Sequence, residues 1–232
     1  MTEPLPPAPD RFRPSAWPSV LLPLLLLVVF AMHIRDQVHF LEFHLHYTPP
    51  PPDLVVRFLV GHGAARPLFH DPHVIAYLAL PLFFVTARAL HRRARDRYPR
   101  ASRAALALTI VGTVYLGGLF GMWTAFYDGL AHVDPTQVEG ATATFAALSA
   151  PRGAFLLTTT LAKLAFAGLA LQGLLLWDRG IRSRIAAIGI ALGSALFLAF
   201  WDLDNWMAIG SLLMLAGLAV AARTDPGGQA SG

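Results

Sequence analysis

Residues 33–47 read HIRDQVHFLEFHLHY and bring four histidines, one aspartate and one glutamate directly after the apolar run WPSVLLPLLLLVVFAM. On a continued helix, residues three, four or seven positions apart share a face. The two sets that share a face are His39, Glu42 and His46, and, more roughly, His33, Asp36 and His44. Imidazole and carboxylate groups are good ligands for Cu²⁺, Zn²⁺ and Fe²⁺, so the stretch predicts a metal or redox site. The alternative is that a helix leaving a membrane simply becomes polar.

A second pair of metal-capable residues lies in the stretch FYDGLAH, where Asp128 and His132 are four residues apart and share a helical face. The pair can chelate one ion, or the aspartate can orient the imidazole from behind. It resembles part of the metal motif in the C subunit of membrane copper monooxygenases, the particulate methane and ammonia oxidisers. In that motif a further histidine follows thirteen residues later, where this chain has Phe145. The alternative is that Asp128 caps the helix end and His132 is solvated.

A third stretch, FHDPH, puts His70 and His73 at the start of the next apolar segment. Together with His33 and His132, these histidines come from three predicted helices at one membrane level. The predicted metal ligands are therefore His33, Asp36, His39, His73, Asp128 and His132, with copper favoured over iron or zinc. A haem held by two histidines is an alternative, although bis-histidine cytochromes usually place both ligands within the spans.

Lys163 lies about ten residues into an apolar segment, or ~15 Å deep by helical rise. A charge at that depth costs ~2.5–3.5 kcal/mol on insertion scales, so the lysine is a candidate cofactor-binding residue. It could pair with a carboxylate, donate to a quinone or lipid carbonyl, or titrate in a proton path. The alternative is snorkelling, in which the side chain carries its ammonium group outward.

The composition indicates a chain whose main solvent is lipid. Of 232 residues, 55% are hydrophobic and only 14% are charged, whereas soluble domains carry about a quarter charged residues. The absence of cysteine excludes disulfides, thiolate metal sites and cysteine nucleophiles. The isoelectric point near 10 does not indicate nucleic-acid binding, because lysine occurs once and the arginines lie between apolar runs.

We therefore expect an all-α, polytopic membrane protein, since crossing the hydrocarbon core takes about 20 apolar residues. Three parts are expected: a disordered tail (1–16), a six-helix transmembrane domain (17–222) and a short second tail (223–232). The six predicted spans are 17–34, 73–91, 104–127, 153–176, 183–201 and 206–222.

The arginines predict the orientation of these spans. Seven arginines lie in the stretch 88–103, which connects the second and third spans, and others precede the first, separate the fourth and fifth, and follow the sixth. The positive-inside rule then places both termini in the cytoplasm of a bacterial-type inner membrane. The two long loops on the outer side, 35–72 and 128–152, each predict a short interfacial helix, one from Asp53 to about Val60 and one capped by Asp134.

Small residues predict close helix packing, at Gly117 and Gly121 and again at Gly189 and Gly193. The expected partners are the lipid bilayer and other membrane subunits. The favoured function is a subunit of, or a metal-handling factor for, a copper- or iron-dependent oxidative complex. A cation or small-solute transporter with an outer His/Asp vestibule is the first alternative, and a non-catalytic membrane anchor is the second. The sequence leaves open whether the protein is an enzyme.

Overall fold

The structure, a computed structural model, describes residues 18–36, 51–62, 71–177, 180–201 and 203–223, and the side chains of 33–36, 61–62 and 204 are outside that description. The described part is helical throughout and contains no strand. Its elements are α1 (Pro18–Asp36), α3 (Pro52–His62), α4 (Pro72–Leu78), α5 (Leu80–Ala94), α6 (Pro99–Ala131), η3 (Pro135–Gln137), α7 (Val138–Ser149), α8 (Gly153–Ala162), α9 (Leu164–Leu174), α10 (Ile181–Ala199) and α11 (Asp204–Arg223).

Each of the six predicted spans coincides with a helix or a pair of helices, which confirms the all-α class. Four helices are long and apolar enough to cross a membrane: α6, the continuous α8–α9 stretch, α10 and α11. The α4–α5 pair makes a fifth if its 42° bend lies within one span, and the apolar part of α1 is shorter, at Pro18–Met32. The described helices thus indicate a multi-pass membrane protein with four or five spans.

Local sequence signals explain where several helices begin. Asp71 caps α4 by accepting a hydrogen bond from the His73 N–H at 2.8 Å, and Pro72 follows at the first helical position, as predicted. Asp134 likewise caps the short η3 turn that leads into α7. Pro81 lies in the first turn of α5, where its ring cannot sit beneath the carbonyl one turn earlier, so the α4–α5 pair bends at Ala79.

Four helices meet at a cluster of phenylalanines in the middle of the bundle. Phe166 of α9 stacks on Phe197 of α10 with ring centroids 4.2 Å apart. Phe83 of α5 meets Phe166 edge-on at 5.4 Å, and Phe30 of α1 meets Phe197 edge-on at 5.6 Å. All four rings are buried, so this cluster fixes the helices relative to one another without polar contacts.

Glycines allow close helix crossings within this chain, and the tightest is at Gly112 of α6, where a Cβ atom would lie 1.9 Å from the Ala165 nitrogen of α9. A Cβ atom on Gly193 of α10 would lie 2.5 Å from the Gly210 carbonyl oxygen of α11, and one on Gly189 would lie 2.9 Å from the Gly217 Cα. Gly117 and Gly121 of α6 face Leu80 of α5 and Tyr77 of α4 in the same way, although less tightly. The predicted small-residue faces therefore pack helices inside the bundle.

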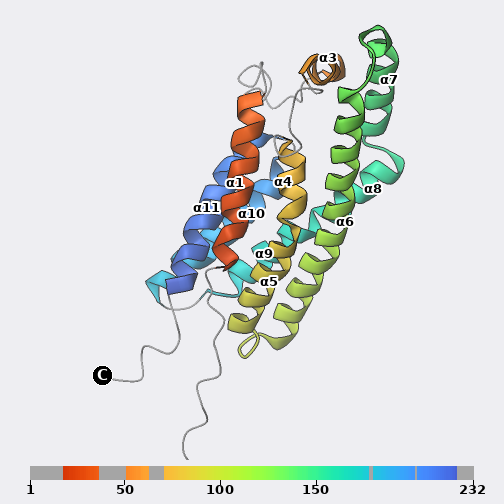
Figure 1. Cartoon of the computed structure of the whole chain (residues 1–232). Helices are drawn as coiled ribbons and strands as arrows, with labels where there is room; N and C mark the ends of the chain where they lie inside the picture. The colour runs from red at the N-terminus through yellow and green to blue at the C-terminus, as the bar shows by residue number, and fades with distance from the viewer. Residues whose placement is uncertain (1–17, 37–50, 63–70, 178–179, 202, 224–232) are drawn as a thin grey trace, which may run out of the picture.

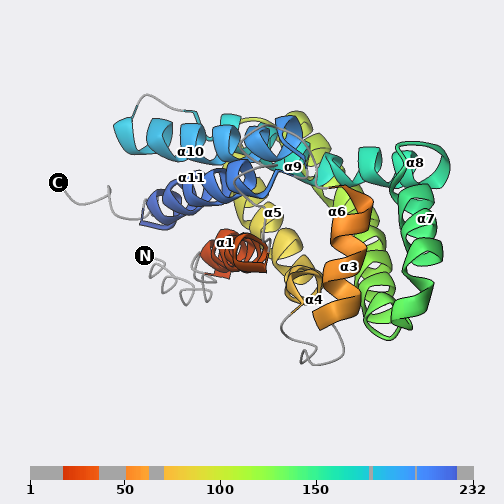
Figure 2. The same ribbon diagram turned by 90° about the horizontal axis from the view of Figure 1, so that it is seen from above.

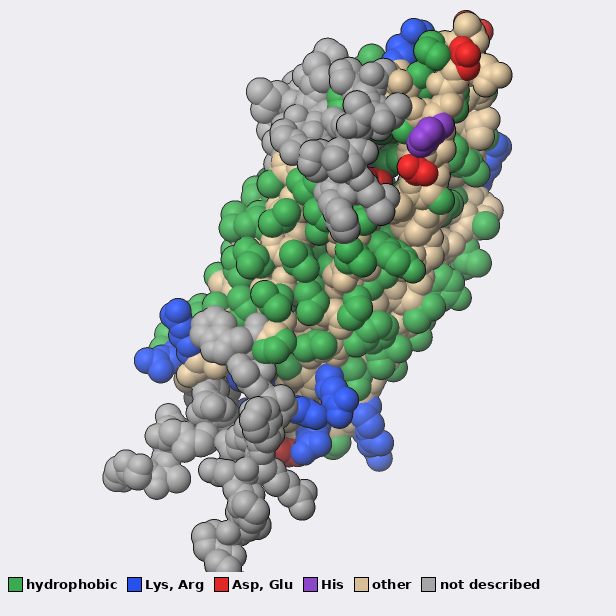
Figure 3. All heavy atoms as spheres, viewed as in Figure 1, with side chains coloured by type: hydrophobic (Ala, Val, Ile, Leu, Met, Phe, Trp, Pro, Cys, Tyr) green, Lys and Arg blue, Asp and Glu red, His purple; other side chains and the backbone are tan. Residues whose placement is uncertain are grey.

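The two ends of the bundle differ in chemistry (Figures 1 and 3). Lys and Arg side chains gather at the end that carries the α5–α6 turn, called here the arginine end, and an apolar belt separates it from the other end. The other end carries the start of α4 and the end of α6, together with α3 and α7, and is called here the His/Asp end. Figure 2 shows α3 lying crosswise over the bundle helices at this end.

Candidate functional site

The described part of the His/Asp end centres on His73, in the first turn of α4. Its Nδ1 lies 2.9 Å from the Asp71 Oδ1 atom, which also accepts the His73 backbone N–H. The imidazole meets the ring of Tyr127 from α6 edge-on, with centroids 4.7 Å apart. The Asp71 carboxylate therefore fixes the tautomer with hydrogen on Nδ1 and places the lone pair on Nε2, as it does behind metal-bound histidines.

The backbone brings two further predicted ligands to the same end. α1 packs along α4 and runs in the opposite direction, so its last turn lies at the end where α4 begins. His33 and Asp36 are in that last turn, although their side chains are outside the described part of the structure. His39 and the rest of the stretch to position 50 also lie outside the described residues.

Asp128 and His132 lie at the end of α6, but their carboxylate and imidazole groups are not hydrogen-bonded to each other. The His132 Nδ1 atom lies 2.8 Å from the Asp128 backbone carbonyl oxygen, one turn earlier. His132 is itself the residue at which α6 ends, with φ −104° and ψ 3°, so its ring folds back on its own helix. Both side chains are exposed, and the described residues contain no group of three histidine, aspartate or glutamate side chains close enough to hold a metal ion.

Lys163 occupies the break between α8 and α9 and is partly buried. Its Nζ atom lies 5.5 Å from the centroid of the Trp201 ring, a cation–π distance. Trp201 directly follows the last turn of α10, so this contact links the α8–α9 stretch to the α10–α11 connection. The Thr159 hydroxyl, one turn before Lys163, donates to the Phe155 carbonyl at 2.8 Å and is therefore bonded within its own helix.

The α3 and α7 helices form a small second core over the end of α6. Val56, Leu130 and Phe145 are buried there, and Phe145 stacks on Phe126 with centroids 5.8 Å apart. Phe145 stands at the position of the third ligand, a histidine, in the copper-enzyme motif that this stretch resembles, and here its ring fills an apolar cluster. The position therefore carries a packing residue in this chain.

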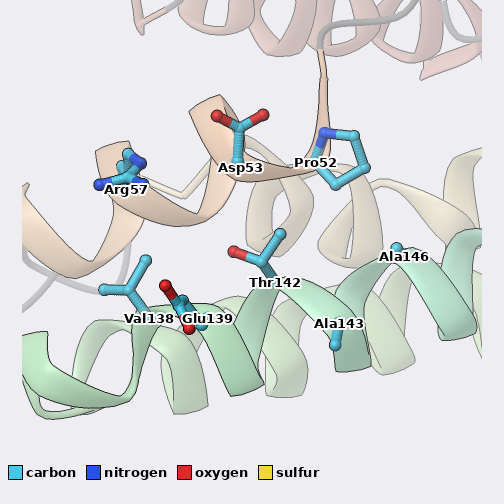
Figure 4. A pocket seen from close by; sticks show the side chains of 8 residues that line it. All are labelled: Pro52, Asp53, Arg57, Val138, Glu139, Thr142, Ala143 and Ala146. Carbon is cyan, nitrogen blue, oxygen red and sulfur yellow. The ribbon is translucent and has the colours of Figure 1, made fainter.

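A shallow groove of about 370 Å³ runs between α3 and α7 (Figure 4). Asp53, Arg57 and Glu139 line it with opposite charges, and Thr142 points from α7 toward α3. The groove is on the exposed surface and mixes one base with two acids. We find no chemistry in it beyond that of a solvated interface between two surface helices.

The pKa of the Asp134 carboxyl is shifted by hydrogen bonds within its own turn. The Thr136 hydroxyl donates to its carboxylate at 2.7 Å and the Thr136 N–H donates at 2.8 Å, and these bonds lower the pKa of Asp134 below its ordinary value of 3.8. The shift stabilises the anion that caps η3. The lowered pKa of Asp134 is therefore explained by its role as a helix cap at the exposed surface.

Sequence reasoning missed two features of the interior. The bend at Ala79 could have been found, because Pro81 interrupts the apolar stretch 73–91. Gln172 of α9 is fully buried and its Nε2 donates to the Ala87 carbonyl of α5 at 2.9 Å. A glutamine inside an apolar span is a signal of such a cross-helix bond.

Comparison of the whole chain with known protein families, curated proteins and solved structures finds no match.

Proposed function

We propose that this chain is a six-span inner-membrane protein, with both termini in the cytoplasm, that holds a transition metal ion at its His/Asp end. In this proposal α1 and the bent α4–α5 pair each cross once, and the arginine end faces the cytoplasm. The protein would act as a subunit of, or a metal-handling factor for, a copper- or iron-dependent oxidative complex.

The observation that supports a metal site is the orientation of the His73 imidazole. Hydrogen bonding of Nδ1 to the Asp71 carboxylate makes Nε2 the basic nitrogen and raises its strength as a ligand. The other proposed ligands are His33 and Asp36, because the last turn of α1 lies at the end where α4 begins. Copper is favoured, since imidazole suits it and the chain has no thiolate for softer sites.

The test is metal analysis and an optical spectrum of the purified full-length chain supplied with Cu²⁺. The parent protein is expected to retain copper after desalting, and His73→Ala is expected to lose it. Asp71→Asn keeps a good helix cap but removes the charge behind the imidazole, so copper affinity is expected to fall roughly 10–100-fold.

His91→Ala is the matched control, because His91 lies at the arginine end and its Nδ1 is engaged with Ser102 at 2.7 Å. Copper binding that survives His73→Ala, or a parent protein that retains no metal, would rule out this site. A Soret band in the parent spectrum would show that the protein binds haem, and the proposed metal ion would then be the haem iron.

A bent helix pair and a partly buried cation favour transport as the second candidate function. The α4–α5 pair bends at Ala79, and Lys163 lies within the continuous α8–α9 stretch. Broken helices inside a membrane bundle are typical of transporter binding sites. Uptake of Cu²⁺ into vesicles that carry the purified protein, abolished by Lys163→Met and unchanged by Arg103→Gln, would move the assignment to transport. Absence of uptake by the parent protein would exclude it for that ion.

A further inference from the structure

A second concave surface lies at the arginine end, between the antiparallel helices α5 and α6. It encloses about 490 Å³, within the range of small-ligand sites, roughly 300–1,000 Å³. The lining residues are Phe84, Arg88, His91, Arg92, Arg95, Leu106 and Ile110. Three cationic or titratable residues of α5, together with Arg95 directly after it, therefore share one groove with three apolar residues. Neither the metal proposal nor the transport proposal places any of them in a site.

The cationic part of this groove consists chiefly of Arg88 and Arg92, one helical turn apart and both exposed. Within the described ranges neither guanidinium has an ion-pair partner. The nearby Arg95 Nε lies 3.5 Å from the Asp96 carboxylate, but both side chains are largely exposed, at 58% and 90%, so that pair is weak. The groove therefore keeps a net positive charge that suits an anion.

His91 fixes one wall of the groove. Its Nδ1 lies 2.7 Å from the Ser102 hydroxyl of α6, and Ser102 is fully buried. This bond ties the two helices together beside the arginines. The cationic residues thus stand on a braced hairpin, which limits the ordering cost of binding.

The apolar part of the groove lies deeper along the helices. Phe84 precedes Arg88 by one turn, about 6 Å toward the middle of the bundle. Phe84 and Ile110 are 37% and 39% exposed. Ile110 lies on α6, which is apolar enough to cross a membrane, and Phe84 lies on α5, which is apolar enough together with α4. A ligand that spans the whole groove would present an anionic head to the arginines and a hydrocarbon chain to these side chains.

We propose that the α5–α6 groove binds an anionic phospholipid, with its phosphate group between Arg88 and Arg92 and an acyl chain along Phe84, Leu106 and Ile110. Arginine pairs with phosphate oxygens through two parallel N–H donors, so two guanidiniums can hold one headgroup. Basic pockets between membrane helices, at the arginine-rich side, are suited to acidic lipids. The bound lipid would be a structural partner of the hairpin, present in the membrane whether or not the His/Asp end holds a metal.

The test is native mass spectrometry of the full-length chain in detergent, titrated with phosphatidylglycerol or with phosphatidylcholine. The parent protein is expected to prefer phosphatidylglycerol. Arg88→Gln combined with Arg92→Gln is expected to weaken phosphatidylglycerol binding by roughly 30-fold, since each cationic side chain near an anionic lipid surface contributes about fivefold. The control is Arg100→Gln combined with Arg103→Gln, which removes the same charge from exposed positions outside the groove.

Ile110→Trp is a second variant that keeps every charge and fills the apolar part of the groove. It is expected to weaken lipid binding without changing the helix content of the protein. Equal losses in the two arginine pairs would overturn the proposal in favour of general surface charge. Displacement of the lipid by inorganic phosphate, or full lipid binding by Ile110→Trp, would also overturn it, because the site would then recognise a free anion and have no place for the chain.

Discussion

At the His/Asp end, three polar side chains are hydrogen-bonded to groups two to four residues away in the chain. These local bonds join Asp71 to His73, His132 to the Asp128 carbonyl, and Asp134 to Thr136. At the arginine end, by contrast, the groove between α5 and α6 is lined by basic and apolar side chains with no acid among them, and Arg88 and Arg92 have no ion-pair partner among the described residues. Local bonds orient single groups, whereas the groove between helices offers a concave surface to a ligand.

This contrast shows why the two ends suit different partners. An imidazole that is held by a neighbouring carboxylate presents the lone pair of one nitrogen in a fixed direction, which suits a metal ion. A pair of solvated guanidiniums is better suited to a large anion whose position is fixed by its apolar part.

The largest expected effect tests whether the two ends of the bundle lie on opposite sides of the membrane. Because the chain has no cysteine, single-cysteine variants give an unobstructed background for labelling. Glu139→Cys is expected to react with an impermeant maleimide from outside intact cells, whereas Arg95→Cys and Arg182→Cys are expected to react only after permeabilisation. Thr2→Cys should follow Arg95→Cys if α1 crosses. Labelling of positions 139 and 95 from one side would remove the separation on which both proposals depend.

The next largest effect concerns the glycine crossing that holds α10 against α11 between the two ends. Gly193→Leu forces side-chain atoms into the Gly210 carbonyl and is expected to cost about 3 kcal/mol of stability. Gly118→Leu is the control, because a Cβ atom there meets nothing within 4 Å. Denaturation in detergent, followed by circular dichroism, measures both. Similar midpoints for the two variants would show that α10 and α11 do not pack as described.

The smallest expected effect tests the local hydrogen bonds by which Asp134 caps η3 at the His/Asp end. Since the folded pKa of Asp134 is lowered, its contribution is present above the ordinary value of 3.8 and is lost as the pH falls through the lowered pKa. Asp134→Ala is expected to speed amide exchange in η3 and the first turn of α7 slightly at neutral pH. The difference from the parent protein should vanish in acid, below that pKa. A difference that persists there would mean that the anion is not the cause.

Hydropathy and caps were sufficient to predict the helices. The apolar stretches indicate where helices lie, and the caps at Asp71 and Asp134 indicate where two of them begin. These signals depend on residues close together in the sequence, so they can be identified without the tertiary structure. The number of crossings stays a prediction, because the apolar part of α1 is short and the α4–α5 pair is bent.

The candidate site was less accessible to sequence reasoning. Spacing predicted that Asp128 and His132 share a face, but the conformation of His132 at the helix end directs its Nδ1 to a backbone carbonyl. Trp201, which lies beside Lys163, and the α6 residues that share the groove with Arg88 are brought there by tertiary packing. Residue spacing along a single helix cannot predict such contacts.

The guanidinium of Arg93 donates to the backbone carbonyl of Ala221, near the end of α11. The donor leaves the ribosome 128 residues before its acceptor, so the bond can form only after α11 has been synthesised. A nascent chain that has not yet reached α11 lacks this link between α5 and α11. This end of the bundle can therefore close only late in the folding of the described helices.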